Sequence, residues 1–204
     1  MSDFQNQILS GRGGLKNLLS KVPGFKGYIE NEDRRTADKL LREAIADRYG
    51  ELWQRLTAIQ SDFVNQGKIE FLDDLESVSD KLKTFVDRTR HATYGYSSFF
   101  SAIKIDQAKL DQLYDYDNAL LDGVDKLSGA LDALEFAGDD GAIIESIRNI
   151  NGIARDSVQA ISRRKDVITG GIDEATPESI RNINTIEPGE PGENAEPDSI
   201  RNIN

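Results

Sequence analysis

The chain has 204 residues, no cysteine and a net charge of −11, and 38% of its residues are hydrophobic. This charge argues against nucleic acid as the main partner, because phosphate binding needs a basic surface, and the lack of cysteine excludes disulfides and thiolate chemistry. The length allows one compact domain with an appendage, and the low hydrophobic fraction is typical of a thin helical bundle.

Residues 1–28 are expected to be an irregular lead-in that contains one short amphipathic helix. Three glycines at positions 11, 13 and 14 should interrupt any helix before it, and Pro23 should end it. This helix could touch an anionic membrane surface, or it could pack on the end of a helical bundle. We favour packing, because one short helix with two or three lysines binds lipid weakly. The residues of the candidate membrane contact are Leu15, Lys16, Leu18, Leu19, Lys21 and Val22.

Four longer helices are predicted in a body of residues 29–168, at about 30–66, 68–92, 106–136 and 142–165. Their apolar residues recur at steps of three and four, which indicates coiled-coil-like seams. In the first of them we expect Glu30, Glu32 and Asp33 in the first turn and a stop at Gly67. Because short turns join these helices, the fold class is predicted as all-α, an elongated antiparallel four-helix bundle. The seam of the first helix is Leu41, Ile45, Tyr49, Leu52, Leu56, Ile59 and Phe63.

Three features interrupt or end these seams. Residues 94–100 hold four aromatic side chains between two helices, and they either plug the end of the bundle or form a second contact surface. Asp117 falls where an apolar residue is expected, so we predict a partner such as Arg48 or exposure at a wide seam. The cations of residues 163–165 are expected to interact with the negative end of the last helix dipole.

From residue 169 to residue 204 the composition changes. Four of the five prolines lie beyond residue 170, and residues 170–204 carry eight acids and two arginines, a net charge of −6. A segment of low hydrophobicity and high net charge cannot bury enough apolar surface to fold alone. We therefore predict a disordered acidic tail.

A seven-residue string occurs three times, and six of its residues are identical in every copy. The first copy lies in the predicted fourth helix, where its isoleucines belong to the seam. The two tail copies each follow a proline, an arrangement that favours helix initiation. After an initial Glu145, Glu178 or Asp198, the copies are Ser146, Ile147, Arg148, Asn149, Ile150 and Asn151; Ser179, Ile180, Arg181, Asn182, Ile183 and Asn184; and Ser199, Ile200, Arg201, Asn202, Ile203 and Asn204.

Three hypotheses account for the tail copies. They dock as short helices onto a partner protein, such as a scaffold or an enclosing shell, and tandem copies add avidity. Alternatively they dock onto the bundle of the same or a neighbouring chain, which gives self-association. They could also be a duplication that an unstructured tail tolerates. We favour partner docking, because the copies retain isoleucine in a tail that is otherwise poor in apolar residues.

The sequence carries no recognisable catalytic pattern. His91 is the single histidine, so it cannot complete a two-histidine metal site, and neither a phosphate-binding glycine loop nor a nucleophile elbow occurs. We predict a non-enzymatic protein without cofactor or metal. The chain also has no apolar run of membrane-spanning length and no signal-peptide pattern, which favours a cytoplasmic location.

Three segments carry a resemblance to known proteins: VPGFKGY at 22–28, EDRRTADKLLRE at 32–43 and ATYGYSSFF at 92–100. Together they resemble a group of bacterial all-helical proteins. The resemblance covers residues 15–135 and leaves out the tail and all three heptapeptide copies. It implies a bacterial, helical, non-catalytic protein, and it brings no activity and no functional residue.

Overall fold

The computed structural model describes residues 13–30, 34–92 and 107–169. This part of the chain is built from helices and contains no strand, so the all-α class is confirmed there. One 3-10 helix, η1 (Ile69–Phe71), occurs in the described residues. The α-helices are α2 (Gly13–Lys21), α3 (Phe25–Glu30), α4 (Arg34–Asn65), α5 (Leu72–Arg90), α7 (Gln107–Glu135) and α8 (Asp140–Thr169).

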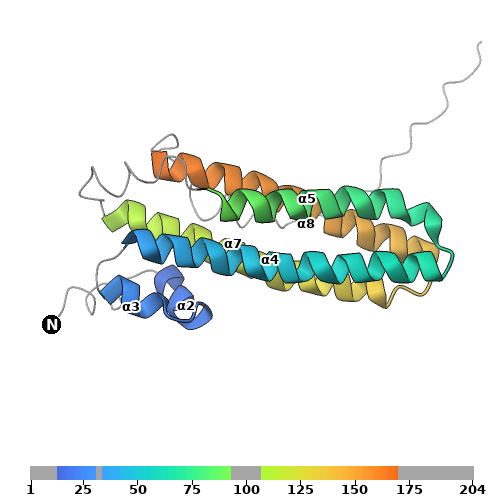
Figure 1. Ribbon diagram of the computed structural model, residues 1–204, viewed down its shortest axis with the longest axis horizontal. Helices are drawn as coiled ribbons and strands as arrows, with labels where there is room; N and C mark the ends of the chain where they lie inside the picture. Colours follow the sequence, from blue (N-terminus) through green and yellow to red (C-terminus); the bar gives the residue numbers. More distant parts are fainter. Residues whose placement is uncertain (1–12, 31–33, 93–106, 170–204) are drawn as a thin grey trace, which may run out of the picture.

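The four long helices lie side by side, with α2 and α3 against one flank (Figure 1). Helix α4 packs on α5 and α7, and α8 packs on the same two helices, while α2 contacts α7 and α3 contacts α4. The α4–α5 and α7–α8 connections lie at the same end of the molecule (Figure 1). We call this the turn end and define it as residues 59–76 and 132–145; the opposite end is called the open end.

The core follows the predicted seams. All seven seam residues of α4 are buried, and the most exposed of them, Leu52, retains 8% of its surface. On α8 the isoleucines at 143, 147 and 150 are buried too. A long helix with such an apolar stripe is stable because the stripe packs against neighbouring helices rather than because of its intrinsic propensity.

Two turns depend on a glycine with positive φ. After α4 the chain reverses at Gly67 (φ +74°), where the amide of Lys68 donates to the carbonyl of Phe63 at 2.9 Å and the amide of Gly67 to that of Val64 at 3.1 Å. This is the Schellman arrangement, which satisfies the last carbonyls of a helix. The predicted glycine stop at residue 67 is therefore confirmed. Between α2 and α3, Gly24 has φ +81° and follows Pro23, as a type II turn requires.

Helix boundaries differ from the expectation at four places. The second long helix, expected at 68–92, begins only at Leu72 as α5, because the 3-10 helix η1 occupies residues 69–71. The lead-in contains a second short helix, α3, and its first helix already starts at Gly13, so this glycine does not break it. Helix α4 begins at Arg34, so Glu30 lies at the end of α3 and not in the first turn of α4. Helix α8 spans residues 140–169 rather than 142–165. It starts early because Asp139 Oδ1 accepts a hydrogen bond from the amide of Ala142 at 2.9 Å, an N-cap contact.

Several predictions fall on residues outside the described ranges. These are the aromatic segment at 94–100, the acids at 32 and 33, and the disorder of the tail from residue 170. Among the helices that the structure describes, none is both long and apolar enough to cross a membrane.

Candidate functional site

The first heptapeptide copy forms part of α8 and shows how this string behaves as a helix. Ile147 and Ile150 point into the core and retain 3% and 0% of their surface. Arg148 and Asn149 between them are exposed, and Ser146 and Asn151 are half-buried. The predicted burial of the two isoleucines is confirmed. As a helix, the string therefore has one apolar edge and one polar edge.

The tail copies at 178–184 and 198–204 lie outside the described residues, so their contacts rest on the sequence alone. The isoleucine spacing is the same in each copy, and residues three apart lie on one face of a helix. A helical tail copy would thus present the edge that α8 buries. What such an edge can do is fill a hydrophobic groove on another surface.

The candidate membrane-contact helix is docked on the helical body. Leu18 and Val22 retain 0% and 2% of their surface, and Leu19 is half-buried. Lys21 Nζ pairs with Asp122 Oδ1 on α7 at 2.5 Å. On α2 the structure describes side chains from residue 17 onwards, and those of Leu15 and Lys16 are therefore not among them. A membrane contact by the buried face would need α2 to detach first.

Detachment of α2 would cost free energy, because it exposes apolar side chains that are now buried. Burying a Leu or Val side chain is worth about 1.5–3 kcal/mol, so exposing Leu18 and Val22 would cost roughly 3–6 kcal/mol. The guanidinium of Arg48 on α4 also donates to the carbonyl of Lys21 at 3.0 Å, at the end of α2 where carbonyls lack helical partners. The docked position is therefore supported by apolar and polar contacts together.

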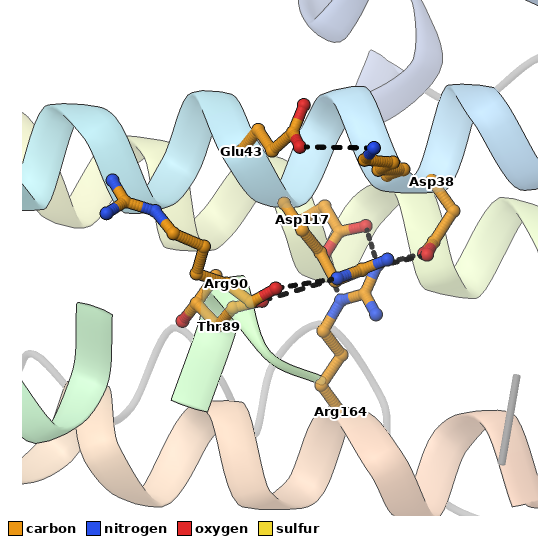
Figure 2. Close-up of polar contacts among 8 residues, drawn as sticks. Asp38, Glu43, Thr89, Arg90, Asp117 and Arg164 are labelled. Carbon is orange, nitrogen blue, oxygen red and sulfur yellow. Dashed lines mark hydrogen bonds and ion pairs between the residues drawn. The ribbon is translucent and has the colours of Figure 1, made fainter. Parts of the chain in front are cut away.

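A cluster of buried charges joins three of the long helices towards the open end (Figure 2). Arg164 of α8 is fully buried and donates from Nε to Asp117 Oδ1 at 2.6 Å and from Nη2 to Asp117 Oδ2 at 2.8 Å. The same Nη2 donates to Asp38 Oδ1 of α4 at 2.7 Å. Such a bidentate contact is the strongest geometry that an arginine and a carboxylate can form.

Arg42 extends this cluster to α5. Its Nε donates to Asp38 Oδ2 at 2.9 Å, and its Nη1 lies 3.5 and 3.4 Å from the carbonyl oxygens of Thr89 and Arg90. The last carbonyls of a helix have no partner within the helix, so an arginine here caps α5. Two carboxylates and two guanidiniums neutralise one another in the cluster. Its contacts hold α4, α5, α7 and α8 together.

The cluster corrects two predictions. The partner of Asp117 is Arg164 and not Arg48, which contacts Lys21 instead. Arg164 does not act as a solvated cation at the end of a helix dipole; it is buried between α4 and α7. Burial raises the pKa of the Asp117 carboxyl above its ordinary value, and the charge and hydrogen bonds of Arg164 act against this shift.

A second buried polar contact lies at mid-length, where Tyr49 reaches across the core. Its hydroxyl lies 3.2 Å from the carbonyl oxygen of Leu120 and 3.3 Å from Ser157 Oγ. Burial raises the pKa of Tyr49 to about 12, and the Ser157 hydrogen bond slightly opposes this. A Cβ at position 123 would come within 3.0 Å of this hydroxyl, so Gly123 makes room for it.

His91 lies exposed at the end of α5, with Nδ1 2.9 Å from the carbonyl oxygen of Asp87. Within residues 13–30, 34–92 and 107–169, no group of three or more histidine or acidic side chains is arranged to hold a metal ion. No known protein family, curated protein or solved structure matches the chain. The function must therefore be inferred from its own residues.

Proposed function

We propose that this protein is a non-enzymatic adaptor or cargo-type protein whose two tail heptapeptides dock onto a partner protein, such as a scaffold or shell. The observation that supports this most is the burial of Ile147 and Ile150 in α8, because it gives the repeated string a defined apolar edge. The tail copies keep both isoleucines in a segment that offers them no core of its own.

In this proposal the tail copies fold as short helices when they bind. Each isoleucine pair fills a groove on the partner, and Arg181 or Arg201 lies on the exposed edge, as Arg148 does in α8. Binding of a disordered segment costs conformational entropy, which keeps each single contact weak. Two copies on one flexible chain offset this, because the second contact forms at a high effective concentration.

The proposal treats the helical body as the carrier of the tail. It takes α4, α5, α7 and α8 as an antiparallel four-helix bundle with coiled-coil-like seams, and residues 170–204 as a flexible acidic tail of a cytoplasmic bacterial protein. The closed ring of packing contacts among the four long helices supports the bundle. The composition of the tail, with eight acids and four prolines, supports its flexibility.

The test replaces the four tail isoleucines at 180, 183, 200 and 203 by serine in the full chain and compares the proteins recovered from cells. A matched control replaces Ile172 and Ile186, which lie in the tail but outside the copies. The four-serine variant should lose the bound protein while the control retains it, and both should melt like the wild type. An unchanged set of bound proteins in the four-serine variant would refute the proposal.

Two further measurements separate this function from its alternatives. If the tail docks onto a second copy of the bundle, the purified wild type sediments as an oligomer and the four-serine variant as a monomer. If residues 4–26 bind membranes, the full chain co-sediments with anionic vesicles, and a variant that lacks residues 1–27 does not. Partner docking predicts neither result.

A further inference from the structure

Exposed apolar side chains gather at the turn end. Among the side chains that the structure describes, the large apolar ones that remain exposed are Val64, Ile69, Phe136 and Ile144, and Phe136 retains 85% of its surface. Val64 and Ile69 flank the α4–α5 connection, and the other two flank the α7–α8 connection (Figure 1). Apolar residues scattered singly over a surface need no explanation, whereas contiguous exposed apolar patches mark contact surfaces. All four residues belong to connections at one end of the molecule, so we treat this end as a candidate contact surface.

The same end is strongly acidic. Residues 59–76 and 132–145 contain ten acids and one lysine, a net charge of −9, and every one of these acids is exposed. The acids are Asp62, Glu70, Asp73, Asp74, Glu76, Asp132, Glu135, Asp139, Asp140 and Glu145. The turn end therefore combines uncovered apolar side chains with a rim of negative charge.

Local structure accounts for only part of this charge. Asp73 and Asp74 lie in the first turn of α5, and Asp139 and Asp140 begin α8, where the positive end of a helix dipole favours acids. Asp132 and Glu135 pair with Arg55. Glu70 lies in the first turn of the short helix η1. The remaining three acids, Asp62, Glu76 and Glu145, neither begin a helix nor pair with Arg55. No helix-capping requirement explains an 85% exposed phenylalanine at position 136.

The charge of the turn end decides between candidate occupants. The tail of the chain carries −6, the turn end of a second copy is equally acidic, and an anionic membrane is negative as well, so all three are repelled. The half of a second copy away from the turn end has a net charge of +7 over residues 13–30, 34–48, 81–92, 107–120 and 155–169. Together with the −6 of residues 170–204, which follow Thr169 in the sequence, this leaves a net charge of only +1. A cationic partner from outside the chain remains.

We propose that the turn end binds a cationic amphipathic helix of another protein. The apolar face of that helix covers Phe136 and Ile69, and its lysines and arginines lie against the acidic rim. An exposed aromatic ring also attracts cations. The chain itself shows this contact nearby, where Lys68 Nζ lies 5.3 Å from the ring centroid of Phe63. This surface contains no residue of the tail, so together with the proposed tail docking it gives the protein two partners.

The probe for this surface is a fluorescent synthetic helix of leucine and lysine in amphipathic order, titrated against the full chain. We expect binding that weakens as salt is raised, with amide NMR shifts confined to residues around 64–71 and 136–145. The double variant Phe136→Ser with Ile69→Ser should lose at least about tenfold in affinity, as expected when exposed anchors at the centre of an interface are truncated. Both side chains are exposed, so the fold should not change.

Charge is tested separately with matched variants. Glu70→Gln with Glu145→Gln removes two acids at the turn end and should weaken binding several-fold and flatten its salt dependence. Glu51→Gln with Asp87→Asn removes two exposed acids elsewhere and should leave the affinity unchanged. The variant with four tail serines should bind the probe like the wild type, so failure of tail docking and failure of this proposal give different results.

Four outcomes would overturn the proposal. In the first, a control peptide with the same leucines and lysines in scrambled order binds as tightly as the amphipathic probe, which indicates charge attraction alone. The serine variants at 69 and 136 bind like the wild type. The Glu51 and Asp87 pair weakens binding as much as the turn-end pair does. Finally, the wild type self-associates without peptide and Phe136→Ser abolishes this, which identifies a second copy as the occupant.

Discussion

Replacement of Arg164 by methionine should be one of the most destabilising single substitutions in this protein. Methionine keeps much of the aliphatic side chain but removes the Nε and Nη2 groups that donate hydrogen bonds from α8 to Asp117. Asp38 loses one contact and keeps Arg42 at 2.9 Å. The substitution therefore leaves one buried carboxylate almost uncompensated.

The magnitude follows from three hydrogen bonds of 2.6 to 2.8 Å between charged groups. Hydrogen bonds to charged groups contribute roughly 1.5–3 kcal/mol each, and relief from desolvating the guanidinium offsets part of their loss. Breaking a buried ion pair on one side typically costs about 3–5 kcal/mol. We expect a loss of that size in the free energy of unfolding. It is a large fraction of the roughly 5–15 kcal/mol that stabilises a typical domain.

Urea unfolding followed by far-UV circular dichroism measures this loss. Arg163→Met is the control, because Arg163 is the exposed neighbour on the same helix and its loss should change stability by less than about 0.5 kcal/mol. Removal of both charges, in Asp117→Leu with Arg164→Met, should cost much less than the sum of the two single changes. Equal effects at positions 163 and 164, or additive single changes, would refute the account of the cluster.

Two further predictions concern buried polar groups. Burial raises the pKa of Asp117, so the folded state holds this proton to a higher pH than the unfolded chain does. The stability of the wild type relative to Asp117→Asn should therefore be greatest below the unfolded pKa of about 3.9 and should fall as pH rises through the folded pKa. Urea titrations at several pH values measure this difference. If the relative stability rises with pH instead, the charge and hydrogen bonds of Arg164 outweigh the effect of burial on the Asp117 pKa. Gly123→Ala should destabilise by about 1–3 kcal/mol, because its methyl group displaces the Tyr49 hydroxyl. Tyr49→Phe should rescue part of that loss, whereas Gly129→Ala on the same helix, with nothing within 4 Å of the new methyl, should raise the melting temperature.

Periodicity alone predicted the parts of the fold that depend on one helix at a time. The seam of α4 and the isoleucines of α8 are buried where steps of three and four place them. The stop at Gly67 was also predictable, since a residue with positive φ at the end of a helix is most often glycine. Helix α3 was not predicted, because its six residues include Gly27 and are too few for a periodic signal.

The buried cluster depends on how different helices align, which no single-helix pattern contains. A signal was nevertheless present in the seams. Leu41 is the first seam residue of α4, and a step of three residues before it leads to Asp38. Ile161 is buried on α8 in the same apolar pattern as Ile147 and Ile150, and a step of three residues after it leads to Arg164. Asp117 already occupied a seam position. Charges of opposite sign that continue apolar seams at the same end of a bundle predict a buried ion pair. Arg48 was a wrong partner because it lies off the seam and faces α2.

Affinity for the recovered partner tests most directly whether each tail heptapeptide is a binding unit. The measurement compares the full chain with variants that carry serine at 180 and 183, at 200 and 203, or at all four positions. We expect each single-copy variant to bind ten- to hundredfold more weakly than the wild type, because avidity is lost, and the four-serine variant not to bind. Equal affinity in all four proteins would contradict the claim.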